Sequence, residues 1–316
     1  MKAVLAAMLW LPLAASASCG SAFCSINTSW DAHGAWLEPG ARLDLRYESI
    51  RQDQPRTGRR NLAVGEIPHH HDEVLTQNRN LLATLDYTLN QDWGMNVLLP
   101  IVDRHHDHIH NHAGGQIPES WDFTRIGDMR VMARRRLTSR EDPTSHVLAT
   151  SAVSLGVKLP TGQTNVRNAE GELAERSLQP GSGTTDFVAG ASYSVALPDR
   201  DLSWFVQGLT QLPMNERDEY RPGHRFNVDL GGRYDANERL GVLLQLNALF
   251  KARDRGADAE PEDTGGKFLF LSPGVSYAFS RQLQAYAFIQ LPLYQDVNGL
   301  QLVARHAIAI GLNTRF

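Results

Sequence analysis

The stretch that decides the fold is FNVDLGGRYDANERLGVLLQLNALF, residues 226–250. In its first half, the apolar residues Phe226, Val228 and Leu230 alternate with polar ones. This period of two places apolar side chains on one face of a β-strand and polar side chains on the other. A polar run at 235–239 precedes a second strand at 240–250, so the stretch predicts an antiparallel hairpin.

The same pattern recurs along the whole chain after residue 40. Each apolar face is continuous for about ten residues, the length that a tilted strand needs to cross a bilayer. Twelve such strands are predicted, at 42–48, 81–89, 93–101, 129–137, 147–159, 187–197, 202–212, 226–234, 240–250, 269–279, 283–293 and 302–316.

The connections between these strands alternate in length. Short ones are expected at 90–92, 138–144, 198–201, 235–239 and 280–282. Longer ones are expected near 52–74, 104–122, 160–184, 213–224, 253–266 and 295–301. Short periplasmic turns and long extracellular loops are typical of outer-membrane barrels. We therefore expect an all-β protein, a 12-stranded antiparallel transmembrane β-barrel in a Gram-negative outer membrane, with both termini periplasmic.

The strand ends and the chain end agree with this prediction. Leu-Pro pairs close four of the odd-numbered strands, at 99–100, 159–160, 212–213 and 291–292. Proline lacks the N–H that a sheet ladder needs, so it suits a strand end. The chain finishes on Phe316 after an alternating strand, which resembles the sorting signal that the barrel assembly machinery reads.

The N-terminal region divides into two parts before the barrel at 40–316. Residues 1–17 have a basic residue, a short apolar run and Ala15-Ser16-Ala17, the pattern of a secretory signal peptide. Residues 18–39 then form a periplasmic segment or a plug of the lumen. Cys19 and Cys24 are the two cysteines, and a local disulfide is expected in an oxidising compartment; lipidation of Cys19 is the alternative.

Two short motifs resemble one known family. Lys158-Leu159-Pro160-Thr161-Gly162 is followed, after a polar loop, by Gly181-Ser182-Gly183-Thr184-Thr185-Asp186 and an alternating strand. These motifs are similar to those of the outer-membrane barrels grouped under the MetA pathway of phenol degradation. The resemblance covers roughly strand two to the C-terminus. It implies an outer-membrane barrel that passes aromatic or other small organic solutes, and it implies no catalytic residues.

The alternation also predicts which charged residues face the lumen. A lipid-facing Arg or Lys at the midplane would cost about 2–4 kcal/mol, so the lumen is the cheaper placement. Two readings stay open: a salt-bridged, closed interior, or a polar pore with a mild preference for anions. The candidates for selectivity are Arg130, Arg134, Arg136, Arg42, Arg46, Lys158 and Arg233.

Histidines gather in the first two expected loops. Alternate residues of an extended segment share a face, so His106, His108, His110 and His112 are expected to lie together. Imidazole suits Zn²⁺, Cu²⁺ and Ni²⁺. The candidate metal ligands are His69, His70, His71, His105, His106, His108, His110 and His112. A solvated polar loop or a pH-sensitive gate are the other readings.

Three functions are compatible with these features. The leading one is an outer-membrane channel or transporter for a small solute, with the His-rich surface loops modulating it through a divalent metal. The second is a closed barrel that binds metal at the surface or acts as a scaffold. The third, a lipid-modifying enzyme, is disfavoured because none of the expected nucleophile motifs occurs.

The partner and cofactor expectations follow from the same reading. A formal net charge of −4 argues against nucleic acid. The expected partners are outer-membrane lipid, the barrel assembly machinery and a small-molecule solute, for a monomer that requires no cofactor.

Overall fold

The computed structural model describes residues 18–19, 25–28, 39–68, 71–112 and 115–316. The side chains of residues 18, 19 and 112 are excepted. Within these residues, no helix is both long and apolar enough to cross a membrane. The predicted signal peptide, residues 1–17, lies outside the described residues.

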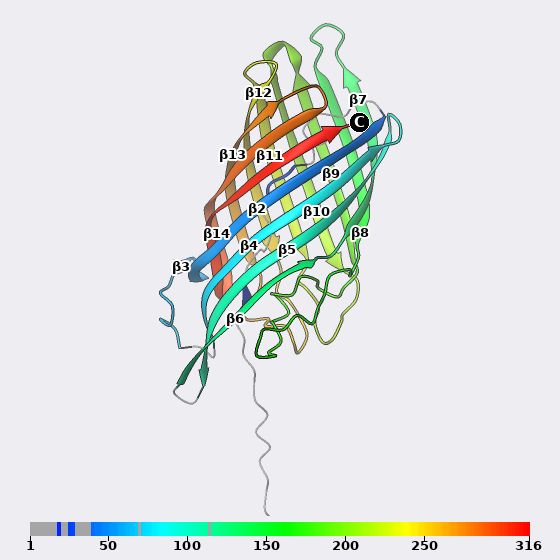
Figure 1. Cartoon of the computed structure of the whole chain (residues 1–316). Coiled ribbons are helices and arrows are strands. Elements are labelled where there is room, and N and C mark those ends of the chain that lie inside the picture. The colour runs from blue at the N-terminus through cyan, green and yellow to red at the C-terminus, as the bar shows by residue number, and fades with distance from the viewer. Residues whose placement is uncertain (1–17, 20–24, 29–38, 69–70, 113–114) are drawn as a thin grey trace, which may run out of the picture.

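The described chain is a closed antiparallel β-barrel (Figure 1). Each strand of the ring pairs with its neighbours, and pairing of the last strand with the first closes it. Eleven strands form the ring: β2 (Gly40–Gly58), β4 (His71–Thr88), β5 (Trp93–His112), β7 (Arg130–Glu141), β8 (Leu148–Lys158), β9 (Asp186–Leu197), β10 (Leu202–Pro213), β11 (Arg225–Asp235), β12 (Leu240–Lys251), β13 (Gly266–Ala278) and β14 (Leu283–Arg315). Outside it lie β1 (Ser18–Cys19), β3 (Arg60–Asn61), β6 (Gly115–Ile126) and the short 3₁₀ turn η1 (Pro198–Arg200).

The strand count differs from the predicted twelve at β14. This element has 33 residues and covers both of the last two predicted strands. Residues 284–297 pair with β13, and residues 297–315 pair with β2. The N–H of Arg315 donates to the carbonyl of Gln282 (2.9 Å), and Gly299 adopts a φ of +56°, so the element folds back on itself. Strand geometry continues through this reversal because glycine tolerates a positive φ.

The first two expected loops are largely strand. β2 runs on to Gly58, and β5 continues to His112, where β6 pairs with it from Ile126 back to Gly115. The histidine-rich part of β5 is polar on both of its faces, so apolar–polar alternation does not reveal it as a strand. The connections 159–185, 214–224 and 252–265 gather at the same end of the barrel as the β5–β6 hairpin, away from the C-terminus (Figure 1).

In β2, apolar side chains point outward and polar side chains point inward, as the alternation predicts. Leu45 and Tyr47 are about two-fifths exposed on the outside, whereas Asp44 and Glu48 are buried inside. The same outward apolar placement holds for Leu85 and Tyr87 on β4. Keeping charge off the outer face avoids the cost of a charged group in lipid. The interior is therefore polar, and its apolar clusters are small.

Candidate functional site

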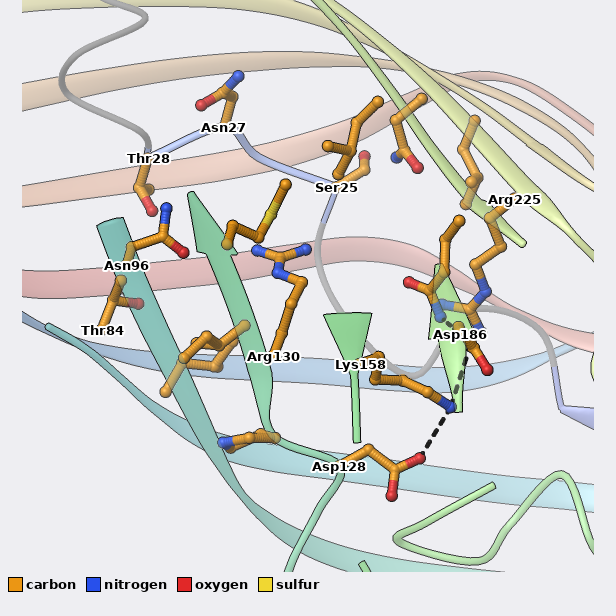
Figure 2. Close-up of a pocket in the computed structure, with 18 of the residues that line it drawn as sticks. Ser25, Asn27, Thr28, Thr84, Asn96, Asp128, Arg130, Lys158, Asp186 and Arg225 are labelled. Atoms are coloured by element: carbon orange, nitrogen blue, oxygen red, sulfur yellow. Dashed lines mark hydrogen bonds and ion pairs between the residues drawn. The ribbon is translucent and has the colours of Figure 1, made fainter. Parts of the chain in front are cut away.

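A cavity of about 390 Å³ lies in the lumen. Its walls are side chains of the barrel strands, above all β4, β5 and β7–β11. Two of the non-strand segments that line it are Ser25–Thr28 near the N-terminus and residues 176–182 of the 159–185 connection, except Leu178. Asp128, Tyr220, Pro222 and Gly223 line it as well. Figure 2 shows Ser25, Asn27 and Thr28 facing the same space as Arg130, Lys158 and Arg225. Both segments narrow the lumen.

Four of the seven predicted selectivity residues line this cavity: Arg46, Arg130, Arg134 and Lys158. The other three, Arg42, Arg136 and Arg233, are not among its lining residues. Arg233 instead pairs with Asp235 (2.6 Å) near the end of β11. Alternation predicts the face on which a side chain lies, but it does not predict the depth along the barrel at which the lumen widens.

The lumen charges are partly paired. Arg134 contacts Asp86 (3.2 Å), and Arg46 contacts Glu48 (3.1 Å). Arg130 differs, because within the described part of the chain it makes no ion pair and its Nε finds no hydrogen-bond partner. The residues that line the cavity include eight basic and five acidic side chains, an excess of three positive charges. The cavity is therefore suited to a small anion.

The segment Ser25–Thr28 crosses the lumen and is held by amide side chains. The Asn27 N–H donates to Gln245 Oε1 (3.0 Å), and the Gln245 amide donates back to the Asn27 carbonyl (2.9 Å). Asn27 Nδ2 also donates to Gln207 and to Asp229 (3.2 Å). Sequence analysis missed this contact. The signal available was the polar pair Gln245 and Asn247 on the inward face of β12.

The connection 159–185 folds inward at the other boundary of the cavity. Leu178 is fully buried in an apolar cluster with Val102, Trp121 and Leu302. Trp121 Nε1 donates to the Glu172 carbonyl (3.1 Å). The buried guanidinium of Arg104 donates to the Leu178 carbonyl and to Asn78 Oδ1 (2.7 Å). The connection is thus packed into the barrel.

The two sequence motifs that resemble a family meet at the base of this connection. Lys158 Nζ lies 3.0 Å from Asp128 and 3.1 Å from Asp186 (Figure 2). Asp128 also accepts the N–H of Gly162 (3.0 Å) and that of Ser182 (2.9 Å). A Cβ on Gly162 would lie 2.6 Å from the Gly181 Cα, so only glycine permits this approach. The motifs form a clasp that holds both ends of the connection.

The histidines are buried rather than exposed at the rim. His106 and His108 are 0% and 2% exposed, and they share the inward face of β5 with His110. His105 lies on the opposite face, beside Asp107 (3.0 Å) and Asp122 (3.4 Å). The predicted common face of these alternate histidines is found for 106, 108 and 110. His69, His70 and the side chain of His112 lie outside the described residues.

Carboxylates missed by sequence analysis join these histidines. His108 Nε2 lies 2.9 Å from Glu119 Oε2, and His71 Nδ1 lies 4.0 Å from Glu175 Oε1. Burial, followed by the charges of Glu260 and Glu73, raises the pKa of Glu175 well above its usual range. Glu119 faces His108 across the β5–β6 hairpin, whereas Glu175 lies far from the histidines in sequence and only folding brings it to them.

Two further predicted features concern the chain ends. The predicted Cys19–Cys24 disulfide lies outside the described residues, because Cys24 is not described and only the backbone of Cys19 is. Phe316 is 69% exposed, and its carbonyl accepts the N–H of Ala41 (3.1 Å). The C-terminal residue is therefore joined to the start of β2, and its role as a sorting signal stays a prediction.

Comparison with known proteins identifies the family. The model of the family described as "Putative MetA-pathway of phenol degradation" matches residues 75–299. The chain belongs to this family. No curated protein matches the chain.

Solved structures agree with the fold. The chain is similar to an outer membrane channel from Pseudomonas putida F1, with a TM-score of 0.65 and 13% identity over 92% of this chain and 100% of that one. More distant similarity is found to the NanC porin (TM-score 0.45, 10% identity, 87% and 100% covered) and to the KdgM porin in complex with disordered oligogalacturonate (0.43, 9%, 87% and 99%). The protein is an outer-membrane β-barrel with a porin-like channel fold.

Proposed function

We propose that this barrel is an outer-membrane channel for a small anionic organic solute. The observation that carries the proposal is the lumen cavity of about 390 Å³, with its excess of basic side chains and with Arg130 directed into it. A cavity of this size admits a small molecule. Membership of the family and the similarity to an outer membrane channel support the same function.

The proposed arrangement in the membrane follows from the exposed apolar band. We place the end that carries 159–185 and the β5–β6 hairpin at the exterior and the C-terminus in the periplasm. Ser18–Cys19 pairs with Gln301 and Leu302 of β14, at the opposite end of the barrel from Phe316, so these residues do not match the expectation of two periplasmic termini. Within the described residues, Ser25–Thr28 then act as a partial plug of the lumen, which Asn27 anchors. We assign no catalytic residue, and the channel works as a monomer without a required cofactor.

The test is the conductance of the refolded protein in a planar bilayer across a salt gradient. Discrete openings with a reversal potential that favours anions are expected. Replacing Arg130 and Arg134 jointly by Ser should shift that potential toward cations, because two positive charges leave the cavity wall. The matched control is Arg233→Ser, which lies outside the cavity. An unchanged reversal potential in the double variant would remove the assignment of these arginines.

A second function is favoured by one observation. Both 25–28 and 159–185 occupy the lumen, so a closed barrel that binds metal or serves as a scaffold is the alternative. This alternative would be favoured if neither the wild-type protein nor a variant without the Asn27 side-chain hydrogen bonds conducts ions in a planar bilayer. We further propose that divalent metal modulates permeation, and the histidine cluster supports this.

A further inference from the structure

The buried histidine cluster joins four segments of the chain: β4, the two strands of the β5–β6 hairpin and the 159–185 connection. His71 and Glu73 come from β4, and His106 and His108 come from β5. Glu119 lies on β6, and Glu175 lies in the 159–185 connection. A metal bound among these side chains would therefore cross-link the barrel wall and the inward connection.

Charge is concentrated in this cluster without exposure to solvent. Glu73 is 1% exposed, and the side chain of Glu175 is 10% exposed. Neither carboxylate oxygen of Glu175 accepts a hydrogen bond from the described residues. A buried carboxylate is costly unless a cation or hydrogen-bond donors compensate its charge. The surroundings of Glu175 thus favour a bound cation.

The donor atoms already lie close together. His71, His108 and Glu175 form one group, and Glu73, His106 and His108 form a second, with the ligand atoms of each group within 4.8 Å of one another. His106 Nε2 lies 3.4 Å from His108 Nδ1 and 3.9 Å from a Glu73 oxygen. Nitrogen and oxygen ligands at about 2.0–2.2 Å surround a zinc ion, so small side-chain movements would complete either group.

A hydrogen bond orients one of these rings. His106 Nδ1 lies 2.9 Å from the Thr76 hydroxyl, so its Nε2 is the atom presented to Glu73 and His108. Metal-binding histidines are characteristically held in this way through their second ring nitrogen. Mixed imidazole and carboxylate ligands select first-row transition metals over Mg²⁺ or Ca²⁺.

We propose that His71, Glu73, His106, His108 and Glu175 form a buried site for one divalent transition-metal ion of the Zn²⁺ class. The ion ties the 159–185 connection to β4 and β5. Arg176, the residue after Glu175, lines the lumen cavity and lies 5.0 Å from the Tyr220 ring. Metal at Glu175 therefore sets the position of a cavity-lining cation. The metal site stands independently of conduction, whereas its effect on permeation rests on the proposed channel function.

The first experiment measures Zn²⁺ binding to refolded, chelator-treated protein without an affinity tag, by calorimetry in detergent. One tightly bound ion per chain is expected. His108→Ala should weaken binding by about 100-fold or more, because His108 belongs to both ligand groups. The matched control is His105→Ala, whose side chain points to the other face of β5. Equal losses in both variants would show nonspecific binding by a His-rich segment and would overturn the site.

A folding check keeps this test decisive. Glu175→Gln removes one ligand charge from a connection that is not part of the ring of strands, so the barrel should assemble normally. Gel electrophoresis without heating should then show the band of the folded protein. Zn²⁺ binding should still fall clearly in this variant. A folded Glu175→Gln protein that binds Zn²⁺ as the wild type does would remove Glu175 from the ligand set and overturn the proposed cross-link.

The second experiment reports on the cross-link itself. Trypsin has an exposed target at Arg167 within the 159–185 connection. Zn²⁺ should slow cleavage there by about tenfold or more in the wild type, which corresponds to at least about 1.4 kcal/mol of local stabilisation. It should leave the rate unchanged in Glu175→Gln. Metal binding with no change in cleavage would contradict the cross-link.

The failures of the two proposals are distinguishable. Zn²⁺ binding by a barrel that never conducts would leave the metal site intact and remove the channel function. Conductance without Zn²⁺ binding would do the reverse.

Discussion

Two segments enter the lumen, and they are held in different ways. The short segment at 25–28 is held by hydrogen bonds from Asn27 to Gln245 and from Arg46 to Thr28 (2.9 Å). Its Ile26 side chain is also buried in an apolar cluster of the barrel wall. The connection 159–185 combines an apolar cluster around Leu178, the buried Arg104 and the clasp at Lys158. Individual hydrogen bonds contribute about 1 kcal/mol net, whereas truncating a buried leucine costs about 2–5 kcal/mol and removing one partner of a buried charge pair costs about 3–5 kcal/mol. We therefore expect single substitutions in the connection 159–185 to cost more stability than a substitution of Asn27.

The largest effect is expected at the clasp. Lys158→Met leaves Asp128 and Asp186 buried without their shared cation, so the free energy of unfolding should fall by about 3–5 kcal/mol. Denaturant titration of the refolded barrel measures it. Arg60→Met, which breaks the exposed pair with Glu66, is the control and should change little. A clasp variant as stable as this control would contradict the contrast drawn above.

A smaller loss is expected in the apolar cluster. Leu178 is fully buried, so Leu178→Ala should destabilise its surroundings by about 2–5 kcal/mol. Because the cluster fastens the connection rather than the ring, trypsin cleavage at Arg167 should accelerate more than global unfolding. Leu173→Ala, at a side chain that is 43% exposed in the same connection, is the matched control. Equal cleavage rates in the two variants would mean that the connection is fastened elsewhere.

The smallest change in stability is expected at the N-terminal segment. Asn27→Ala removes its side-chain hydrogen bonds to Gln207 and Asp229 and should cost about 1–2 kcal/mol. Conductance in a planar bilayer should nevertheless rise, because the segment leaves the lumen more often. Asn61→Ala, an exposed substitution on β3, should leave conductance unchanged. A stable, fully conducting wild type that Asn27→Ala does not alter would show that the segment does not restrict flow.

The sequence was most successful in predicting which side of a strand points into the lumen. Arg134 and Arg46 lie inward where alternation placed them, and His106 and His108 share one face as expected, because successive side chains of a strand must point to opposite sides. It was least successful for the extent of strands. The histidine-rich part of β5 was expected to be loop, yet β4 and β6 pair with it on either side. Backbone pairing with two neighbours outweighs the weak preference of a polar segment for a loop.

Alternation of side chains and the paired motifs around Lys158 and Ser182 were enough to predict a barrel, its family and the inward face of each strand. These features depend on neighbours along the chain or on short recurring patterns. Only the folded barrel decides three other features. These are the depth of Arg130 in the lumen, the hydrogen bonds of Asn27 to β10 and β12, and the proximity of Glu175 to His71 and His108. Ring closure places residues that are tens to hundreds of positions apart within contact distance, and no local pattern records which of them will meet.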